Sequence, residues 1–271
     1  MAAVGPASSD LDAVPRALQD HGYALIDGGP SSPEEAARFL LELGHQLGTV
    51  VPQSPRGESV EDVRDFSDVD EADSRGYRSS GELSPHSDPP TLTVLHCLQA
   101  ARSGGTTRLV DVHTIRDRLA HHSPRLLEVL FEPVPMWRVD GQRGIADGGP
   151  DAEGPPVFAE HGGLLSCVYY RPYIEQSAAA LGQPLTDEQR AALDQFDHWA
   201  TSPELGVAID LVPGQTLVVH NRRVLHARDD YQDWPEPQRR RHLLRLWVDA
   251  PRWFDVAPVH RLGDIFAPLP R

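Results

Sequence analysis

The C-terminal part of the chain is divided into short β-type runs, and this pattern restricts the fold more than any other feature. A Pro213-Gly214 turn separates two of the runs, and every run is shorter than an ordinary helix. Successive short strands joined by turns are typical of two packed sheets or a barrel. The predicted strands cover 206–211, 215–219, 224–228 and 241–248.

Upstream of these runs, strands and helices are mixed. Ser32-Pro33-Glu34-Glu35 offers an N-cap, a proline at the first helical position and a capping-box glutamate, so a helix is predicted up to about Leu47. Thr186 with Gln189 predicts a second capping box and another helix. Further strands are expected at 23–26, 91–98, 107–111 and 164–170, and further helices at 114–121 and 123–131.

These elements predict one domain over residues 1–271, mainly β with helical decoration. The expected architecture is a double-stranded β-helix, a barrel of the jelly-roll or cupin-like kind. Two segments are expected to lie over a ligand site at its mouth. One is a polar, irregular loop at 52–85, and the other is a flap at 140–163, of which 140–156 is rich in Gly and Pro.

The composition excludes several kinds of partner and chemistry. The net charge of −15 argues against a nucleic-acid partner, because binding to phosphates requires a basic face. All 25 basic residues are arginine, which excludes Schiff-base aldolases, lysine-anchored pyridoxal-phosphate enzymes and P-loop lysines. The sequence shows neither an export signal nor a membrane-spanning run, and Cys97 and Cys167 are too few for a disulfide framework. A cytoplasmic protein with a small-molecule substrate is expected, and a homo-oligomer is possible.

A candidate metal site is formed by His86, Asp88 and His226. Residues i and i+2 of a strand face the same side, so His86 and Asp88 can reach one ion, and His226 lies on a strand that can return beside them. Two imidazoles and one carboxylate, without a thiolate, favour a facial Fe(II) site over structural zinc and leave coordination positions open. Nine other histidines are interpreted as surface or helix-end residues (His21, His45, His121, His122, His161, His198, His260) or as core or barrel-lining residues (His96, His220).

The order of motifs resembles that of the taurine dioxygenase-like (TauD/TfdA-like) family of Fe(II)- and 2-oxoglutarate-dependent oxygenases, with the clavaminate synthase-like enzymes close by. The resemblance covers roughly residues 80–250. It is carried by His86-Ser-Asp88, Pro89-Pro90, Gly104-Gly105-Thr106-Thr107, Asn221-Arg-Arg-Val-Leu-His226 and Arg240-Arg241-His-Leu-Leu-Arg245, in this order.

By this resemblance His86, Asp88 and His226 are the iron ligands. Thr107 and Arg241 would bind the distal carboxylate of 2-oxoglutarate, since a guanidinium can grip a carboxylate through two parallel bonds. Strand alternation agrees, because it places Arg241, Leu243, Arg245 and Trp247 on one face and His242, Leu244, Leu246 and Val248 on the other. His226 and Arg241 are 15 residues apart, a little more than is common in the family, so Arg240 or Arg245 stays an alternative for the cosubstrate.

The resemblance implies oxidation of an unactivated C–H bond with O2, releasing succinate and CO2. Asp88 argues for hydroxylation, or desaturation, rather than halogenation, because a halogenating relative replaces this carboxylate with a small residue. The expected substrate is a small carboxylate-bearing molecule, a free amino acid or a natural-product intermediate, and its candidate contacts are Arg245, Arg171, Tyr169, Ser79 and Ser80. The competing interpretations are a cupin-like zinc or manganese hydrolase or isomerase, and a non-catalytic binding protein that retains the fold.

Overall fold

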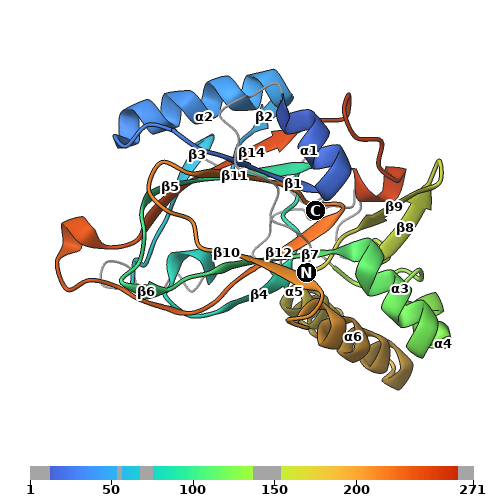
Figure 1. The fold of residues 1–271 in the computed structure, drawn as a ribbon. Coiled ribbons are helices and arrows are strands. Elements are labelled where there is room, and N and C mark those ends of the chain that lie inside the picture. The colour runs from blue at the N-terminus through green and yellow to red at the C-terminus, as the bar shows by residue number, and fades with distance from the viewer. Residues whose placement is uncertain (1–12, 54–56, 68–75, 137–153, 262–271) are drawn as a thin grey trace.

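The computed structural model describes residues 13–53, 57–67, 76–136 and 154–261, and its strands form two main antiparallel sheets that lie as two layers (Figure 1). The first sheet has the order β1 (Tyr23–Ile26), β11 (Thr216–His220), β5 (Leu92–Gln99), β14 (His242–Asp249) and β2 (Thr49–Val51), and β3 (Val60–Val63) also pairs with β14. The second has the order β10 (Gly206–Ile209), β7 (Thr107–Asp111), β12 (Val224–Arg228) and β4 (Leu83–His86). Two small two-stranded sheets complete the strands: β6 (Ser103–Gly104) pairs with β13 (Tyr231–Gln232), and β8 (Phe158–His161) forms a hairpin with β9 (Leu164–Cys167).

Strand alternation divides the apolar residues of the first sheet between its two sides. Leu95 and Cys97 of β5 belong to the same buried cluster as Leu109 of β7 in the second sheet. The alternate residues Leu92 and Val94 pack instead in a cluster that includes residues of α1 and α2. On β14 the predicted division is confirmed, because Leu243 belongs to the first cluster and Leu244, Leu246 and Val248 to the second.

Helices α1 (Val14–His21) and α2 (Pro33–Leu47) cover the outer side of the first sheet (Figure 1). The predicted start of α2 is confirmed, since the Glu35 N–H donates to the Ser32 side chain and the Ser32 hydroxyl donates to the Glu35 carboxylate. Gly44 allows the helix to approach closely, because a Cβ at this position would lie 2.5 Å from Cδ2 of Leu246. A larger residue here would push α2 away from β14.

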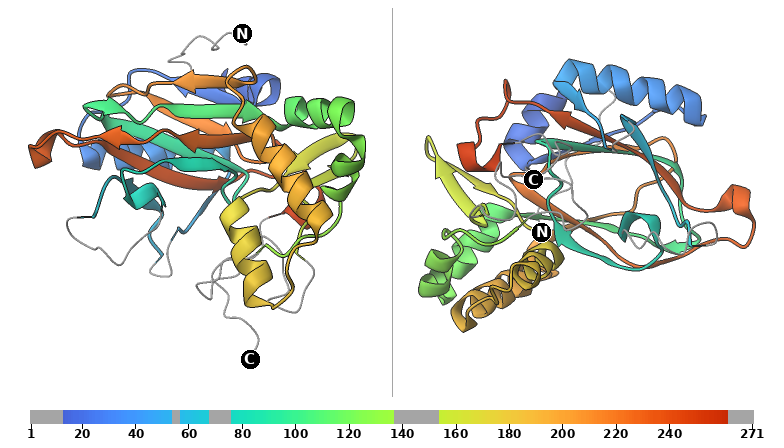
Figure 2. Two further views of the ribbon diagram at one scale, coloured as in Figure 1. Left: turned by 90° about the horizontal axis from the view of Figure 1, so that it is seen from below. Right: turned by 180° about the vertical axis from the view of Figure 1, so that it is seen from behind.

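The second sheet is covered by α3 (Val112–His122), α4 (Pro124–Val129), α5 (Arg171–Ala180) and α6 (Asp187–Ala200), together with the β8–β9 hairpin. Figure 2 shows these helices grouped at one end of the sandwich. They share a buried cluster with Val110 of β7 and Leu225 of β12. The predicted capping box of α6 is confirmed by reciprocal bonds between Thr186 and Gln189.

The predicted class, mainly β with helices, is confirmed. No strand pairing joins the two sheets within the described ranges, so a hydrogen-bonded closed barrel is not shown and the jelly-roll assignment stays a prediction. The interpretation of 52–85 as a loop is wrong for β3 and β4. The β3 run is too short to display an alternating pattern, and its acidic residues Glu61 and Asp62 pair with Arg245 and His242.

The flap predicted at 140–163 is wrong at its C-terminal end, where residues 158–161 form β8 and pair with β9. An extended strand over these four residues was hidden by the Gly- and Pro-rich composition that precedes it. Residues 137–153, which make up most of the predicted flap, lie outside the described part of the chain.

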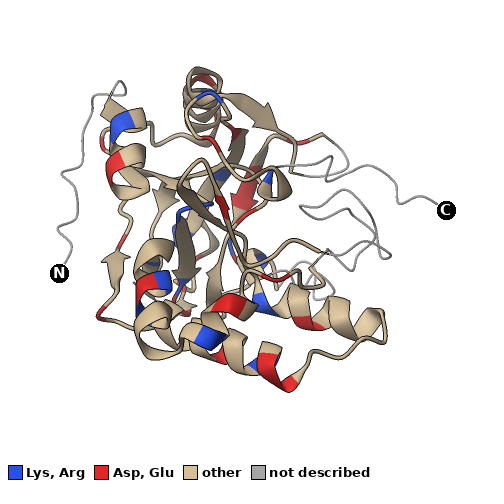
Figure 3. Cartoon of the chain, turned by 90° about the vertical axis from the view of Figure 1, so that its right-hand side faces the viewer, with Lys and Arg blue, Asp and Glu red and all other residues tan. Residues whose placement is uncertain are grey.

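Charge is distributed unevenly between the surface and the interior. On the side shown in Figure 3, basic residues are interspersed with acidic ones along the helices and form no continuous basic face among the described residues. Inside the molecule, by contrast, Arg222, Arg228, Arg241 and Arg245 are all buried. Their burial indicates specific partners, because an unpaired buried cation is costly. In the described part of the chain, no helix combines the length and the apolar character needed to cross a membrane.

His260 was predicted to lie at the surface or at a helix end, and its surface placement is wrong. It ends the short 3-10 helix η5 (Pro258–His260) but is completely buried. Its Nδ1 lies 2.7 Å from the Ser166 hydroxyl, and its Nε2 donates to the Pro156 carbonyl. Burial, with a contribution from Arg222, lowers the pKa of His260 to about 4. The backbone contacts that bury it are distant in sequence, so local pattern gave no signal.

This histidine should destabilise the protein in acid. Its folded-state pKa lies below the unfolded value of 6.5, so the unfolded chain takes up the proton first and stability falls as the pH decreases from about 6.5 to about 4. The substitution His260→Gln should therefore lower Tm at neutral pH but make Tm less dependent on pH down to about pH 5. Thermal unfolding at both pH values checks this, with the exposed His45→Gln as control. If Tm fell between neutral pH and about pH 5 by the same amount in His260→Gln and in the unsubstituted protein, this prediction would be contradicted.

Candidate metal centre

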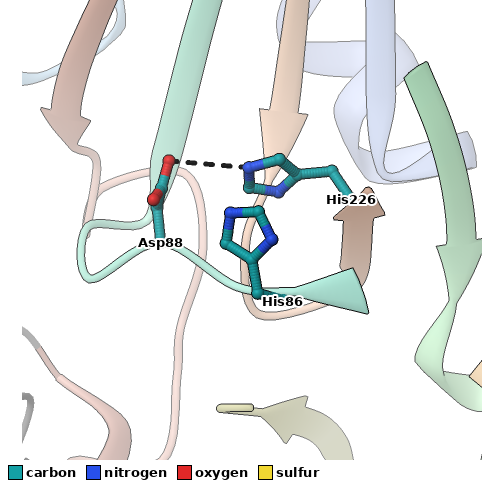
Figure 4. Close-up of side chains that lie close together, drawn as sticks. All are labelled: His86, Asp88 and His226. Atoms are coloured by element: carbon teal, nitrogen blue, oxygen red, sulfur yellow. Dashed lines mark ion pairs between the residues drawn. The ribbon is translucent and has the colours of Figure 1, made fainter. Parts of the chain in front are cut away.

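The three predicted ligands come together between the sheets (Figure 4). His86 is the last residue of β4 and is the register partner of His226 on β12. Asp88 lies two residues beyond β4, so the strand alternation that was expected to place it does not apply. Each residue offers one ligand atom, and these atoms lie within 4.8 Å of one another. Within the described ranges this is the only cluster of three or more such side chains that could hold a metal ion.

The hydrogen bonds leave lone pairs of the two imidazoles available. His86 Nδ1 lies 2.9 Å from the Ser84 carbonyl. A carbonyl only accepts, so Nδ1 carries the proton and Nε2 keeps its lone pair. His226 Nδ1 is buried without a hydrogen-bond partner in the described structure, and its Nε2 lies 3.6 Å from Asp88 Oδ2. A buried imidazole with an unpaired nitrogen fits an ion that is bound at this place.

Burial sets the protonation state of the group. It lowers the pKa of His86, and it lowers the pKa of His226 to about 3 with help from the neighbouring His86. Burial alone would raise the pKa of Asp88, but the Arg245 cation and the hydrogen bond from Thr93 outweigh it and hold that pKa well below its usual range. Neutral imidazoles and an ionised carboxylate are the forms that bind metal. The donor set fits a non-haem Fe(II) ion and leaves neighbouring positions open.

Thr107 and Arg241, the predicted cosubstrate residues, are both buried. Thr107 begins β7, and Arg241 directly precedes β14. Gly105 lets the arginine approach this segment, since a Cβ at Gly105 would lie 3.3 Å from Arg241 Nε. Nη1 of Arg241 is buried and makes no hydrogen bond within the described structure. Burial lowers the pKa of Arg241, which indicates a desolvated cation suited to an incoming anion.

A second arginine, Arg228, was missed. It is the register partner of Thr107, and its Nε and Nη1 are also buried without partners in the described structure. The guanidinium groups of Arg228 and Arg241 lie 4.9 and 5.0 Å from the centre of the Tyr231 ring. Burial and the nearby Arg241 lower the pKa of Arg228 to about 10. Its position two residues after His226, on the same face of β12, was the available signal.

Arg240 and Arg245, the alternatives for the cosubstrate, differ in their surroundings. Arg240 is half-buried and follows the 3-10 helix η4 (Pro237–Arg239). The side chain of Arg245 is buried, and each of its guanidinium nitrogens lies near an acceptor. Its Nε donates to Gln53 Oε1 at 2.7 Å, its Nη2 lies 3.5 Å from Glu61 Oε2, and its Nη1 lies 3.8 Å from Asp88 Oδ1. Of the three arginines, Arg241 thus combines burial with an unpaired donor.

Tyr169 and Arg171, which were also predicted to contact the substrate, are engaged with acidic residues of α5 and α6. Tyr169 is buried, and its hydroxyl donates to the half-buried Asp197 at 2.5 Å. Arg171 forms ion pairs with Glu175, Asp194 and Asp197, which does not favour a role in substrate binding. Tyr170, which the sequence did not single out, is half-buried, with its ring centre 5.6 Å from that of His86.

Ser79 and Ser80 lie on the segment 76–81, which contacts Arg228. Nη2 of Arg228 donates to the carbonyls of Gly76, Ser79 and Gly81. The Ser80 carbonyl accepts from the N–H of Tyr231. One guanidinium thus anchors the segment that carries both serines, next to the unpaired donors of Arg228 and Arg241.

Comparison with known proteins gives consistent matches over most of the chain. A family model described as "Taurine catabolism dioxygenase TauD, TfdA family" matches residues 3–247. FR-33289 synthase from Streptomyces rubellomurinus is 31% identical over 241 residues, which cover 85% of this chain and 70% of that protein. A uridine-5'-phosphate dioxygenase from an Amycolatopsis species is 29% identical over 248 residues, covering 87% of this chain and 88% of that protein.

Among solved structures, asparagine oxygenase in complex with Fe(II), 2S,3S-3-hydroxyasparagine and succinate matches with a TM-score of 0.69. The match covers 93% of this chain and 82% of that chain. The sequence identity is 21%, so this likeness shows a shared fold and nothing finer.

Proposed function

Because this chain belongs to the TauD/TfdA family of dioxygenases, we propose that it is an Fe(II)- and 2-oxoglutarate-dependent enzyme that hydroxylates an unactivated C–H bond of a small carboxylate-bearing molecule. Membership confirms the resemblance drawn from the order of motifs. The observation that carries the proposal is the buried group His86, Asp88 and His226 beside two arginines with unpaired donors. We also propose that the two sheets form a jelly-roll in one domain. Cytoplasmic location and a homo-oligomeric state stay predictions.

Each polar group of the site has a role in this function. His86 and His226 would supply neutral nitrogen ligands and Asp88 an anionic oxygen ligand. Bound Fe(II), with 2-oxoglutarate and O2, supplies the oxidising power, and succinate and CO2 are released. Arg241, with Thr107 and Arg228, would hold the distal carboxylate of 2-oxoglutarate, because two desolvated guanidiniums recover hydrogen bonds when an anion binds. The protein then acts by holding the metal ion, 2-oxoglutarate and the substrate at the distances and orientations that the reaction requires.

The alternatives are distinguished by the same residues. A cupin-like hydrolase or isomerase needs no residues that bind a cosubstrate carboxylate. That function would not explain why Arg228 and Arg241 lie close together with unpaired buried nitrogens. Desaturation stays an alternative to hydroxylation, since both begin at a C–H bond. The presence of Asp88 as a carboxylate supports either of these over halogenation.

The substrate proposal rests on Arg245 and its neighbour Glu61. Their side chains are 9% and 12% exposed, and they form an ion pair 3.5 Å apart beside Asp88. A cation and an anion at one place suit a zwitterion, whose carboxylate would face Arg245 and whose ammonium would face Glu61. The uridine-5'-phosphate dioxygenase named above acts on a substrate that carries an anionic group. The proposed substrate is therefore a free amino acid or a natural-product intermediate that bears a carboxylate.

The test of the proposed function is an anaerobic titration of the apo-protein with Fe(II) and then 2-oxoglutarate. The expected result is the weak visible charge-transfer band of an Fe(II) ion chelated by 2-oxoglutarate. If metal binds but no band forms, the oxygenase proposal fails and the metal hydrolase becomes the better interpretation. A screen of amino acids and their derivatives, scored by succinate formation, would then identify the substrate.

Replacing Glu61 tests the zwitterion proposal once an amino-acid substrate is found. Glu61→Gln should raise the KM for that substrate roughly 10- to 100-fold, since a bond to a charged group contributes about 1.5–3 kcal/mol. The KM for 2-oxoglutarate and the affinity for Fe(II) should stay unchanged. Asp62→Asn is the matched control, because Asp62 is adjacent and ion-paired with His242. Equal KM values for both variants would show that Glu61 does not contact the substrate.

A further inference from the structure

The backbone of Asp88 is held by side chains instead of a strand ladder. Its N–H donates to Asn221 Oδ1 at 3.4 Å, and its carbonyl accepts from Arg222 Nη1 at 3.0 Å. Both partners are buried and directly follow β11. The loop between β4 and β5 is therefore fixed at this residue from a segment more than 130 positions later in the chain.

The carboxylate of Asp88 is held separately. Its Oδ2 accepts from Thr93 Oγ1 at 2.6 Å and from Trp247 Nε1 at 3.2 Å. Thr93 on β5 and Trp247 on β14 are direct register partners, and both are buried. The two donors therefore come from one rigid cross-strand pair in the centre of the first sheet.

Asn221 closes a ring of hydrogen bonds around Asp88. Its Nδ2 donates to Thr93 Oγ1 at 2.9 Å while its Oδ1 accepts from the Asp88 N–H. An amide nitrogen can only donate, so the single proton of the Thr93 hydroxyl must point to Asp88 Oδ2. The direction of every bond in the ring is thus determined, and the ring links the backbone of Asp88 to its own carboxylate.

We propose that Thr93, Asn221 and Trp247 are positioning residues that hold the Asp88 carboxylate in the orientation facing His86 and His226. The inference rests on the proposed function, since it assigns these residues to a metal ligand. Asp88 lies in a loop, where a carboxylate could rotate about two side-chain torsions. The ring and the indole donor remove this freedom before the ion binds, which is how partners behind a ligand strengthen metal affinity.

Thr93→Val tests the inference, because it removes the hydroxyl and keeps the shape. Thr91→Val is the matched control: Thr91 is also buried and its hydroxyl donates to a carboxylate, that of Asp249, at the same 2.6 Å. Anaerobic titrations of the apo-proteins with Fe(II), and with Co(II) followed by its visible spectrum, give affinity and ligand geometry without turnover. Thermal unfolding shows that both variants are folded.

The expected result is a loss of metal affinity of about 10- to 100-fold in Thr93→Val, with an altered Co(II) spectrum. Thr93→Ser should restore both, Trp247→Phe should weaken binding in the same direction, and Thr91→Val should leave both unchanged. Equal affinities and spectra for Thr93→Val and Thr91→Val would overturn this inference but not the proposed function. If the unsubstituted protein binds neither ion, the proposed function is overturned and this inference with it.

Discussion

His226→Ala is expected to abolish Fe(II) binding and succinate formation together. The substitution removes one of three ligands, so the loss should exceed the roughly 10- to 100-fold that is typical of residues behind a ligand. The remaining imidazole and carboxylate cannot define a facial site. Anaerobic titration with Fe(II) and 2-oxoglutarate measures the binding, and released succinate measures the reaction.

A control for this prediction must also be a buried histidine. His96 fits, because it is completely buried and hydrogen-bonded to Thr216 on β11 and to the Pro30 carbonyl before α2. His96→Ala should lower Tm and leave the affinity for Fe(II) unchanged. If His226→Ala binds Fe(II) as tightly as the unsubstituted protein, the metal site has been assigned to the wrong residues.

Arg241→Met should raise the KM for 2-oxoglutarate by a factor of roughly 30 or more. Removing one partner of a buried charged pair costs about 2–5 kcal/mol, and every 1.4 kcal/mol corresponds to a factor of about ten. The affinity for Fe(II) should change little. Tm in the absence of ligand should not fall, because the variant also removes one of two buried like charges near Tyr231.

Arg240→Met tests one of the two alternatives that the sequence left open. Arg240 is adjacent and equally charged, but it is only half-buried, so its replacement should change this KM by less than about threefold. If Arg240→Met had a large effect on this KM and Arg241→Met a small one, Arg240 would be the residue that binds the cosubstrate carboxylate. Steady-state rates against 2-oxoglutarate concentration, measured for both variants, decide between them.

Local patterns predicted the parts of the fold that depend on local chemistry. The capping boxes at Ser32 and Thr186 predicted where two helices begin, because an N-cap satisfies the backbone of its own helix. The alternation in β14 predicted which side chains share a face, because a strand places successive side chains on opposite sides. The pairing of β12 with β4, which sets His226 opposite His86, has no local signal in the sequence. Only the order of the motifs indicated that the two histidines come together.

Features that depend on distant contacts could not be predicted. Asp88 was expected on a strand, but it is positioned by Asn221, Thr93 and Trp247, which come from other parts of the chain. The sequence predicts a loop where β3 forms, because the polar residues of β3 find their partners on β14 only after folding. Arg228 resembled any exposed strand residue until the placement of Tyr231 and segment 76–81 showed it to be buried.

The hydrogen bonds from Arg228 to the backbone of segment 76–81 have a thermodynamic consequence. The same guanidinium that faces the proposed cosubstrate pocket also holds the backbone on which Ser79 and Ser80 lie. Any rearrangement of this segment on substrate binding must therefore change the free energy of cosubstrate binding. Reciprocity requires the cosubstrate to change substrate affinity by the same factor, so the two dissociation constants are linked quantities and neither can be tuned alone.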